Sequence, residues 1–457
     1  MNRLKKFVLT LFVFIFALTG TAFANNATYS EFVSAKMLKP QYWLNKTKNP
    51  GKVLMTASEI ESYNEKTMTK MTSIGAMYNL DLFPKTISGE KIKSYINIDT
   101  FNWQVYEING KPISEDYIRS VKENLNTDAI ADETQVSYGI TVKRSDLVLL
   151  PSADPFIVAS AQDYDNMIQD TEVLYNEPVI VVHKSKDSKW YYCICEATSG
   201  WIPSENIALC KDVNEWNKAK SHDSFLMVTG DEVYLEQDAT KADRAGSALS
   251  FSMGTILPLA DKVPETVEGR APLNNYVVYL PCRNDAGMLE YEYRLVPLSR
   301  DVNVGYLPYT TENVLNLAFK KLGNVYGWGG SLNSDDCSGY IRNLYRCFGF
   351  DFPRNSSKIA IVPFKYQDVS TKTVEEKKKI FDSLIPGSLL YMKGHIVIYL
   401  GSGNGRYYVI DSAGSYINPD DTEITPVLGI TVNTLDLKRR TGNTWLEEIT
   451  AVNQLTK

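Results

Sequence analysis

Histidine is scarce in this sequence, with three residues among 457. Because only His183, His222 and His395 carry an imidazole, general acid–base chemistry near neutral pH is confined to few places. The net charge is −6, so the chain has no overall excess of Lys and Arg, and nucleic acid is not an expected partner. The 44% hydrophobic and 22% charged residues are ordinary for a globular protein.

Cysteine is also sparse, and its spacing argues against a disulfide framework. Cys193 and Cys195 lie two apart on a predicted strand, and the other cysteines are scattered over the chain. We expect most of them to be buried small apolar side chains. A structural zinc site is not expected, since no pair of cysteines has a matching pair of histidines at ligand spacing.

The first 24 residues have the pattern of a secretory signal peptide. Residues 2–6 are basic, residues 7–18 are apolar, and residues 22–24 read Ala-Phe-Ala, a small-residue cleavage site. The apolar run is short for a membrane span, and no cysteine near the cleavage site would take a lipid. We therefore expect an exported protein, secreted, periplasmic or associated with the cell wall, with no stable membrane anchor after processing.

The length predicts three or four domains of about 100–200 residues each. Residues 25–135 are predicted to be a mainly helical N-terminal domain. Thr56 and Glu59 have the spacing of a capping box at the start of one helix. Ser114 precedes a second helix, with Ile118, Val121 and Leu125 on one face.

Residues 136–215 change to short β-branched and aromatic runs separated by turn residues, which predicts a small β-barrel. NEPVIVVHKSKDSKW and GWIPSENIA resemble a bacterial SH3-like domain. Residues 216–306 are predicted to be a second, divergent barrel, with MGTILPLADK and VGYLPYT at the equivalent places. His183, at a strand end, and His222, in the polar segment between the barrels, are expected to have structural roles.

The segment YGWGGSLNSDDCSGYIRNLYRCFGFDFPRNSS, residues 326–357, carries the first candidate for chemistry. Apolar residues from Tyr340 to Phe348 recur at helical spacing, and Gly349 is a plausible end of that helix. Asp336 is a suitable N-cap, which would set Cys337 in the first helical turn. Backbone N–H groups and the helix dipole at that position favour a nucleophilic thiolate. Cys347, later on the same helix, is expected to be buried.

A base and an orienting residue follow on two strand-like runs, GHIVIYLG and YYVIDSAG. His395 is the histidine of this last region, and Asp411 lies near the end of the second run. The order of cysteine, histidine and polar residue is workable for a catalytic triad, with Asp411 accepting from Nδ1–H of the imidazole. Asn404 and Asn418 remain alternatives for the third position.

Together, YGWGG, DCSGYI, FPRNSS and GHIVIYLG resemble the NlpC-type papain-like peptidases of bacterial cell walls. The resemblance implies an α+β papain-like catalytic domain over residues 307–457. The expected fold is therefore multidomain, with the helical N-terminal region and the two SH3-like barrels preceding that domain. The resemblance also implies catalysis by Cys337, His395 and Asp411, without a metal or organic cofactor. It implies these substrate contacts: Tyr326 in the oxyanion region, Trp328 beside it, Asp336 and Ser338 next to the nucleophile, and Asn355 and Ser356 at the substrate's amino terminus.

The function implied by the resemblance is hydrolysis of peptidoglycan stem peptides between γ-D-glutamate and a diamino acid, with a free N-terminal L-Ala preferred. The wall that closes the cleft is expected to be the GWIP segment of the first barrel, packed over Tyr326 and Trp328. Two alternatives are a non-catalytic protein that binds peptidoglycan through its barrels, and an amide or acyl transferase using the same triad.

Overall fold

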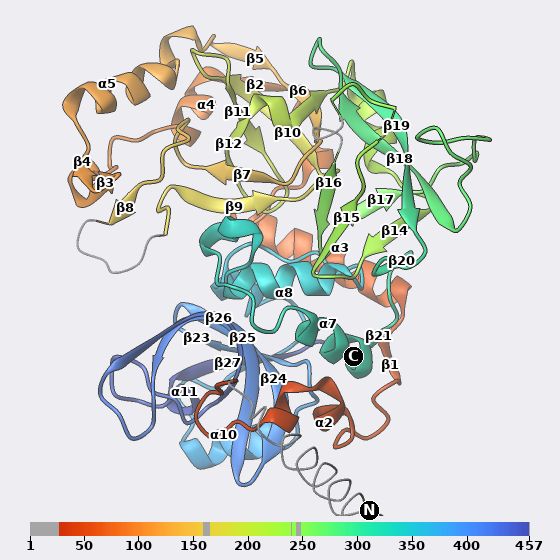
Figure 1. Ribbon diagram of the computed structural model, residues 1–457. Helices are drawn as coiled ribbons and strands as arrows, with labels where there is room; N and C mark the ends of the chain where they lie inside the picture. Colours follow the sequence, from red (N-terminus) through yellow and green to blue (C-terminus); the bar gives the residue numbers. More distant parts are fainter. Residues whose placement is uncertain (1–26, 159–164, 239, 244–247, 457) are drawn as a thin grey trace, which may run out of the picture.

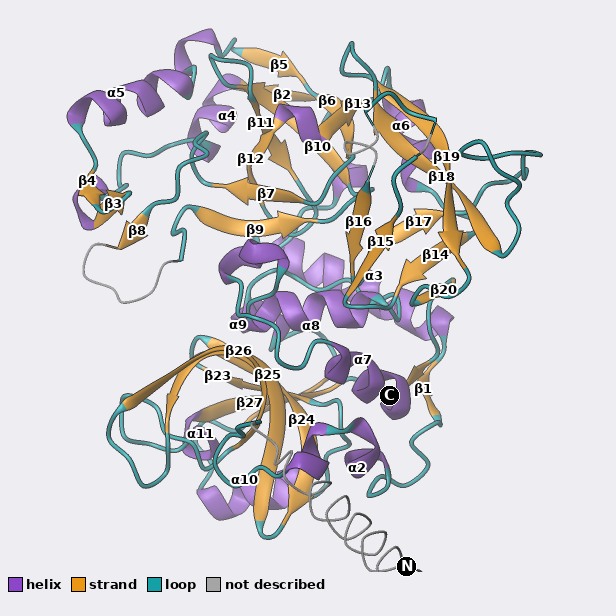
Figure 2. Ribbon diagram, in the orientation of Figure 1, coloured by secondary structure: helices purple, strands orange, loops and turns teal. Residues whose placement is uncertain are grey.

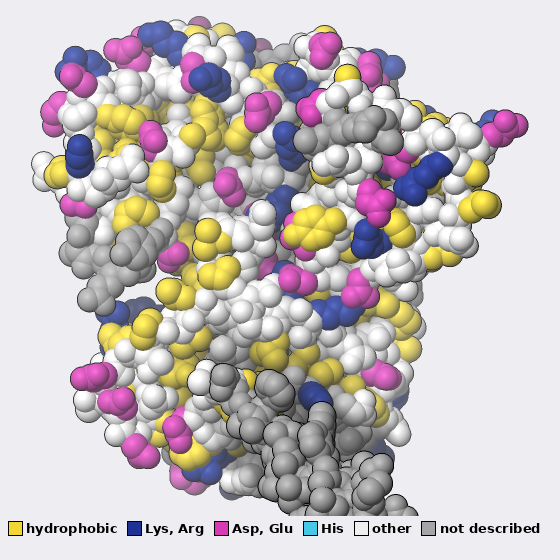
Figure 3. All heavy atoms as spheres, viewed as in Figure 1, with side chains coloured by type: hydrophobic (Ala, Val, Ile, Leu, Met, Phe, Trp, Pro, Cys, Tyr) yellow, Lys and Arg dark blue, Asp and Glu magenta, His cyan; other side chains and the backbone are white. Residues whose placement is uncertain are grey.

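The computed structural model describes residues 27–158, 165–238, 240–243 and 248–456 (Figure 1). The predicted signal peptide, residues 1–24, lies outside the described residues. Two β-rich regions lie side by side above a third region that combines helices with one large sheet (Figure 2). No helix in the described part of the chain has the length and apolar character to cross a membrane. On the face seen in Figure 3, basic and acidic side chains are interspersed rather than gathered by sign.

The N-terminal region alternates short helices with short strands, so the predicted helical domain is not confirmed. Both predicted helix starts are confirmed, because Thr56 and Glu59 form the capping box and Ser114 accepts from Tyr117 N. Its elements are η1 (Ala35–Leu38), α2 (Pro40–Leu44), β1 (Val53–Met55), α3 (Ala57–Ser73), η2 (Leu80–Leu82), β2 (Thr86–Ser88), α4 (Gly89–Tyr95), η3 (Trp103–Val105), β3 (Tyr106–Ile108), β4 (Lys111–Pro112), α5 (Glu115–Asn124), η4 (Thr127–Ala129) and β5 (Glu133–Gln135).

This N-terminal region has no single core of its own. Trp43 and Met71 belong to the hydrophobic core of the last region, and β1 pairs with a strand at Tyr309–Thr310. Ile92 and Val121 belong instead to the core shared by the two β-rich regions. The stretch is therefore divided between two cores, which helix periodicity does not reveal because it reports only local structure.

The first barrel is one continuous antiparallel sheet with the strand order β13-β6-β10-β11-β12-β7-β9. Its strands are β6 (Ser137–Thr141), β7 (Ser145–Val148), β9 (Gln169–Val173), β10 (Pro178–Lys184), β11 (Trp190–Ile194), β12 (Ser199–Pro203) and β13 (Ile207–Leu209), with η5 (Ser204–Asn206) before β13. The separate β8 (Ile157–Val158) pairs with β3. Trp201 is fully buried beside Tyr192 and His183, so the GWIP segment faces the barrel's own interior.

The region predicted to be a second barrel, called the second barrel below, begins after α6 (Val213–Lys220) and consists of three small antiparallel sheets, β17-β14-β20, β15-β16 and β18-β19. Its strands are β14 (Phe225–Val228), β15 (Glu232–Leu235), β16 (Leu249–Ser252), β17 (Ile256–Pro258), β18 (Asn275–Arg283), β19 (Leu289–Pro297) and β20 (Val302–Val304). His222 contacts Asn176 through Nε2 at 3.0 Å, and His183 Nε2 lies 2.9 Å from the Leu125 carbonyl, as expected for structural histidines.

The last region is a six-stranded antiparallel sheet, β22-β27-β23-β24-β25-β26, with helices on both faces. Ile396 and Ile398 of the central strand face α7 and α8, whereas Val397 faces α10 and α11, as alternation along a strand requires. Its elements are β21 (Tyr309–Thr310), α7 (Thr311–Lys320), η7 (Trp328–Asn333), α8 (Cys337–Arg346), α9 (Ser356–Ile359), β22 (Lys365–Asp368), α10 (Val374–Phe381), β23 (Leu389–Met392), β24 (His395–Gly403), β25 (Arg406–Ile417), β26 (Ile424–Thr434), α11 (Trp445–Glu448) and β27 (Ile449–Gln454). The predicted α+β arrangement is confirmed.

Candidate active site

Cys337 is the first residue of α8, which confirms the predicted helix start. The side chain of Asp336, the N-cap, accepts hydrogen bonds from the backbone N–H groups of Ser338 at 3.1 Å and Gly339 at 2.8 Å. The helix ends before Gly349, which has a φ of +88°. Cys337 is 8% exposed and lines a cavity, so the thiol is sheltered but reachable.

His395 opens β24, and its Nε2 lies 2.7 Å from Oδ2 of Asp411 on the neighbouring strand β25. The expected bond from Nδ1 to Asp411 is therefore wrong. α8 packs against both β24 and β25, and with Nε2 of the ring bonded to the carboxylate on β25, Nδ1 remains for the thiol of Cys337. The alternatives do not reach this site, since Asn404 lies at the β24–β25 turn and Asn418 bonds Thr425.

The surroundings of His395 raise the pKa of its imidazole to about 10. Burial opposes the charged ring, but hydrogen bonds and charge interactions with Asp411 and Cys337 outweigh that opposition. The ring is therefore protonated at neutral pH and can donate a proton to a leaving amine. The ring of Trp445 packs edge-on against the imidazole, with the centroids 5.4 Å apart, which helps to hold its orientation.

Asn433 on β26 is a positioning residue that the sequence analysis missed. Its Nδ2 donates to Asp411 Oδ1 at 2.9 Å, so both carboxylate oxygens of Asp411 are engaged. Ser30 Oγ in turn donates to Asn433 Oδ1 at 2.7 Å, which connects the N-terminal segment to the site. No local signal marks Asn433, because it is one polar residue in a strand whose partner is set by tertiary packing.

Asp336 and Ser338, predicted to contact substrate, instead belong to a buried network. The guanidinium of Arg354 bonds both carboxylate oxygens of Asp336, and its Nη1 donates to Ser338 Oγ at 2.8 Å. Burial opposes ionisation of Asp336, but Arg354 outweighs it and holds the pKa of that carboxyl below its usual range. The network fixes the N-terminus of α8, and neither residue lines the cavity.

The glycine-rich approach to α8 packs against β9 of the first barrel, not against GWIP. Gly329 and Gly330 both have positive φ, and a Cβ on either would overlap Gln169 or Glu172 of β9. Arg144, from the β6–β7 connection, donates to the Gly330 carbonyl at 2.6 Å. The prediction that the GWIP segment packs over Tyr326 and Trp328 is therefore wrong, because Trp201 is buried in the core of the barrel.

Tyr326 lines the cavity as expected, and burial raises the pKa of its hydroxyl above the usual range. Trp328 is 36% exposed and lies outside the cavity lining. Asn355 and Ser356 also lie outside it, because Asn355 Oδ1 caps α9 by accepting from Ser357 N at 3.0 Å. Of the predicted substrate contacts, the structure brings only Tyr326 to the cavity lining beside Cys337 and His395.

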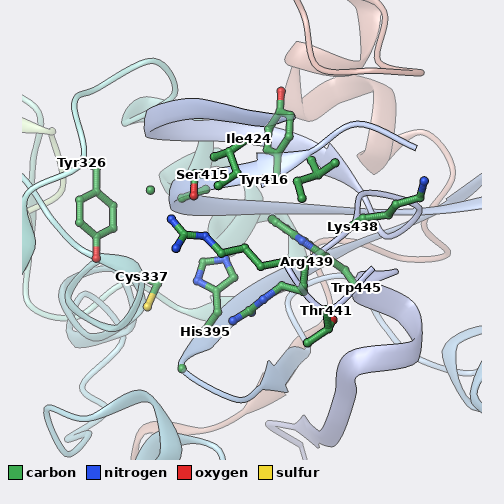
Figure 4. A pocket seen from close by; sticks show the side chains of 15 residues that line it. Tyr326, Cys337, His395, Ser415, Tyr416, Ile424, Lys438, Arg439, Thr441 and Trp445 are labelled. Carbon is green, nitrogen blue, oxygen red and sulfur yellow. The ribbon is translucent and has the colours of Figure 1, made fainter. Parts of the chain in front are cut away.

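The cavity has a volume of about 360 Å³ and extends from Tyr326 past His395 to the loop before α11 (Figure 4). Figure 4 shows Lys438, Arg439 and Thr441 on the opposite side of His395 from Tyr326. Besides the residues already named, the cavity is lined by Gly394, residues 413–417, Ile424 and residues 438–441. Within the described ranges, no group of three or more His, Cys, Asp or Glu side chains is placed to hold a metal ion.

Two family models match the chain. The NlpC/P60 family model matches residues 323–421, and the SH3 domain model of the SH3b1 type matches residues 153–203. The chain is 22% identical over 253 residues to a γ-D-glutamyl-L-lysine dipeptidyl-peptidase of Bacillus cereus (strain ATCC 10987 / NRS 248). That alignment covers 51% of this chain and 66% of the relative, just under two thirds of its length.

One solved structure gives the same picture of the fold. An NlpC/P60 endopeptidase from Photobacterium damselae subsp. piscicida superposes with a TM-score of 0.69 at 17% identity, covering 94% of this chain and 98% of that one. An NlpC/P60 family protein from Bacillus cereus ATCC 10987 covers 70% of this chain and 100% of that one at 17% identity, with a TM-score of 0.46. The chain thus carries an NlpC/P60 domain, a domain of a cysteine-peptidase family, together with an SH3 domain of the SH3b1 type.

Proposed function

We propose that this protein hydrolyses peptidoglycan stem peptides at the bond between γ-D-glutamate and the following diamino acid. The observation that carries the proposal is His395, bonded to Asp411 on one side and to Cys337 on the other, in the lining of a cavity that Cys337 also lines. The matched peptidase family and the named activity of the Bacillus cereus relative support the choice of substrate.

In the proposed reaction, the sulfur of Cys337 attacks the γ-carbonyl carbon, and the protonated His395 donates its proton to the departing amine. Water then attacks the thioester with His395 as base, which releases the γ-glutamyl carboxylate and restores the thiol. Asp411 holds the imidazole through Nε2, and Asn433 holds Asp411. Tyr326 lies on the acyl side of the thiol.

A preference for a free N-terminal L-Ala belongs to the same proposal. β9 of the first barrel packs against Gly329 and Gly330 in the loop after Tyr326, and this packing supports a cleft that is closed to a glycan on the acyl side. Asp165, in the segment that leads into β9, acts electrostatically on Tyr326. That carboxylate places a negative charge near Tyr326, whereas Asn355 is uncharged.

We also propose that the protein acts outside the cytoplasmic membrane, with residues 1–24 as its export signal. The basic and apolar segments before the Ala-Phe-Ala site support this, since stem peptides of the wall lie on that side. N-terminal sequencing of the protein recovered outside the membrane tests it. A mature N-terminus at Asn25 is expected, and an intact Met1 in the cytoplasmic fraction contradicts it.

The activity is tested with a free-amine tripeptide, L-Ala-γ-D-Glu-diamino acid, and its N-acetylated form at matched concentrations. The expected result is release of the diamino acid, with kcat/KM at least about tenfold higher for the free amine, since losing an ion-paired hydrogen bond costs about 1.5–3 kcal/mol. Equal kcat/KM for both peptides contradicts the amino-terminal preference. No hydrolysis of either contradicts the proposed function itself.

A further inference from the structure

The cavity continues beyond His395 on the side where the departing group must lie. In the proposed reaction, His395 donates its proton to the leaving amine. The leaving portion of the substrate therefore occupies the His395 side of the thiol. On that side the cavity is lined by the loop Lys438–Arg439–Arg440–Thr441 and by Trp445, opposite Tyr326 (Figure 4). This loop is therefore placed to contact the leaving group.

Within the part of the chain that the structure describes, the three consecutive cationic side chains at this end of the cavity have no carboxylate partner. Among the described residues, no Asp or Glu oxygen lies within 4 Å of the charged groups of Lys438, Arg439 or Arg440. Arg439 uses one N–H to donate to the Lys393 carbonyl at 3.1 Å, which leaves its other donors available. Asp421 and Glu448 act on Lys438 and Arg439 only electrostatically.

The acidic side chains near this loop are occupied in holding its backbone. Glu448 Oε1 accepts from Thr441 Oγ1 at 2.8 Å and from Asn443 Nδ2 at 3.0 Å. Glu447 closes a capping box with Thr444 at the start of α11. These carboxylates hold the backbone of the loop in place and do not pair with its cationic side chains. The loop therefore presents positive charge to the cavity from a fixed backbone.

We propose that residues 438–440 form a carboxylate-binding subsite that selects an acidic leaving group. This inference rests on the proposed peptidase function. The subsite takes a carboxylate of the released diamino acid or of the peptide that continues from it. Arginine and lysine side chains beside a reactive centre are suited to this role, since charged hydrogen bonds to a carboxylate are short and strong.

The walls beside these cations suit the rest of such a leaving group. Ile417, Ile424 and Trp445 line the same end of the cavity and offer apolar surface for the methylene groups of a diamino acid. A side chain that ends in an ammonium group alone, as in L-lysine, is repelled by the three cations. A diamino acid whose side chain also ends in a carboxylate is attracted to them.

The two possible sources of the carboxylate are separated by four peptides with the same L-Ala-γ-D-Glu start. The third residue is either meso-diaminopimelate or L-lysine, and the main-chain carboxyl of that residue is either free or amidated. We expect kcat/KM to be at least about tenfold higher wherever the recognised carboxylate is present, through a lower KM. A side-chain source separates diaminopimelate from lysine, and a main-chain source separates free from amidated peptides.

Charge-removing variants assign the preference to the loop. Lys438→Gln and Arg440→Gln are expected to reduce the preference about tenfold by raising KM for the preferred peptide, with kcat nearly unchanged. Arg440→Lys keeps the charge and is expected to keep most of the preference. Lys379→Gln, which removes an exposed charge from α10 in the same domain, is the matched control and is expected to change nothing.

Equal kcat/KM for all four peptides overturns the subsite, as does a preference that survives in the Lys438→Gln and Arg440→Gln variants. Failure of the proposed function has a different signature, the absence of turnover for every peptide. In that case, calorimetric binding of the four peptides to the folded Cys337→Ala protein decides the matter. Tighter binding of the carboxylate-bearing peptides, lost in Cys337→Ala with Arg440→Gln, supports the subsite, and equal affinities reject it.

Discussion

Each barrel places one carboxylate beside a cation that also binds one of the two aspartates before Cys337, but the two barrel carboxylates differ in burial. Arg354 bonds Asp336 and approaches Glu172 of the first barrel at 3.9 Å, with the Glu172 side chain fully buried. Lys321 lies 2.9 Å from Asp335 and 2.8 Å from Asp231 of the second barrel, whose side chain is 36% exposed.

This difference in burial indicates that the two barrels have different roles in holding α8. Glu172 also accepts from Asn343 of α8 and packs on Gly330, so the first barrel shapes the loop that carries Tyr326. The second barrel meets the other end of α8, where Cys347 Sγ donates to the Val228 carbonyl and Gly254 approaches the Asn343 carbonyl. We infer that the first barrel backs the active-site loop and that the second supports the far end of α8.

Among these charged groups, replacing Asp411 is expected to cause the largest loss of activity, because this buried carboxylate orients the catalytic histidine and does not bind a barrel. Asp411→Ala is expected to lower kcat by about 100-fold or more, since the imidazole loses its orienting partner, with a smaller change in KM. Asp411→Asn is expected to be milder, because the amide oxygen can still accept from Nε2–H. Steady-state kinetics measures both effects. An unchanged kcat in folded Asp411→Ala would mean that another group orients the imidazole of His395.

Removing the barrel carboxylates compares the two supports directly. Glu172→Ala is expected to lower the free energy of unfolding by about 3 kcal/mol, since it breaks a buried charged network. It is also expected to lower kcat/KM at least about tenfold, because the loop carrying Tyr326 loses its backing. Denaturant titration and peptide hydrolysis measure the two effects.

The matched variant is Asp231→Ala. It is expected to lower the free energy of unfolding by about 1 kcal/mol or less, because Asp231 is partly exposed and Lys321 retains its ion pair with Asp335. Hydrolysis is expected to change by less than about threefold, as is typical of a change away from the reacting groups. Equal losses of activity in Glu172→Ala and Asp231→Ala would remove the distinction between the barrels.

As the pH rises, the stabilisation from protonated His395 is expected to be lost before that from the ion pairs of Lys321. The folded pKa of His395 is raised from 6.5 to about 10, so its stabilisation is fully present below pH 6.5 and is lost as the pH rises through 10. Interactions with Asp335 and Asp231 outweigh burial and raise the pKa of Lys321 above its usual range, so that pair persists to higher pH. Thermal unfolding of wild type and His395→Gln from pH 6 to 11 tests this. A difference in Tm that does not shrink at the alkaline end contradicts it.

The smallest effect is expected at the far end of α8. Cys347 is fully buried, and burial raises the pKa of its thiol to about 12. Cys347→Ala is therefore expected to leave hydrolysis within about twofold and to cost about 1 kcal/mol of stability through the small cavity it leaves. Mass analysis after brief treatment with iodoacetamide is expected to find Cys337 modified and Cys347 intact, and the reverse pattern would mean that the nucleophile has been misassigned.

The parts of this molecule that local patterns determine were predictable from sequence. The N-cap Asp336 and the apolar spacing after it predict α8, and the β-branched runs around His395 and Asp411 predict two adjacent strands. Features set by contacts between distant segments were not. The division of the N-terminal region between two cores, the choice of Nε2, and the packing of β9 rather than GWIP each depend on where another part of the chain lies.

The residues around the triad illustrate the same limit. Asn433 is one asparagine in a strand, and its role follows only from the pairing of β26 with β25. The three cations at residues 438–440 look like a solvated turn in the sequence, because a run of charges is most often exposed. Their position at the end of the cavity depends on the packing of α11 and Trp445 against the sheet.

The most direct test of the proposed active site is the mass of the products from one peptide incubated with three proteins. Wild type and Cys347→Ala are expected to convert L-Ala-γ-D-Glu-diamino acid into the L-Ala-D-Glu dipeptide and the free diamino acid, with the addition of one water. Cys337→Ala, shown to be folded by its unchanged circular dichroism and Tm, is expected to yield neither product. Formation of the same two products by folded Cys337→Ala would contradict catalysis by this cysteine.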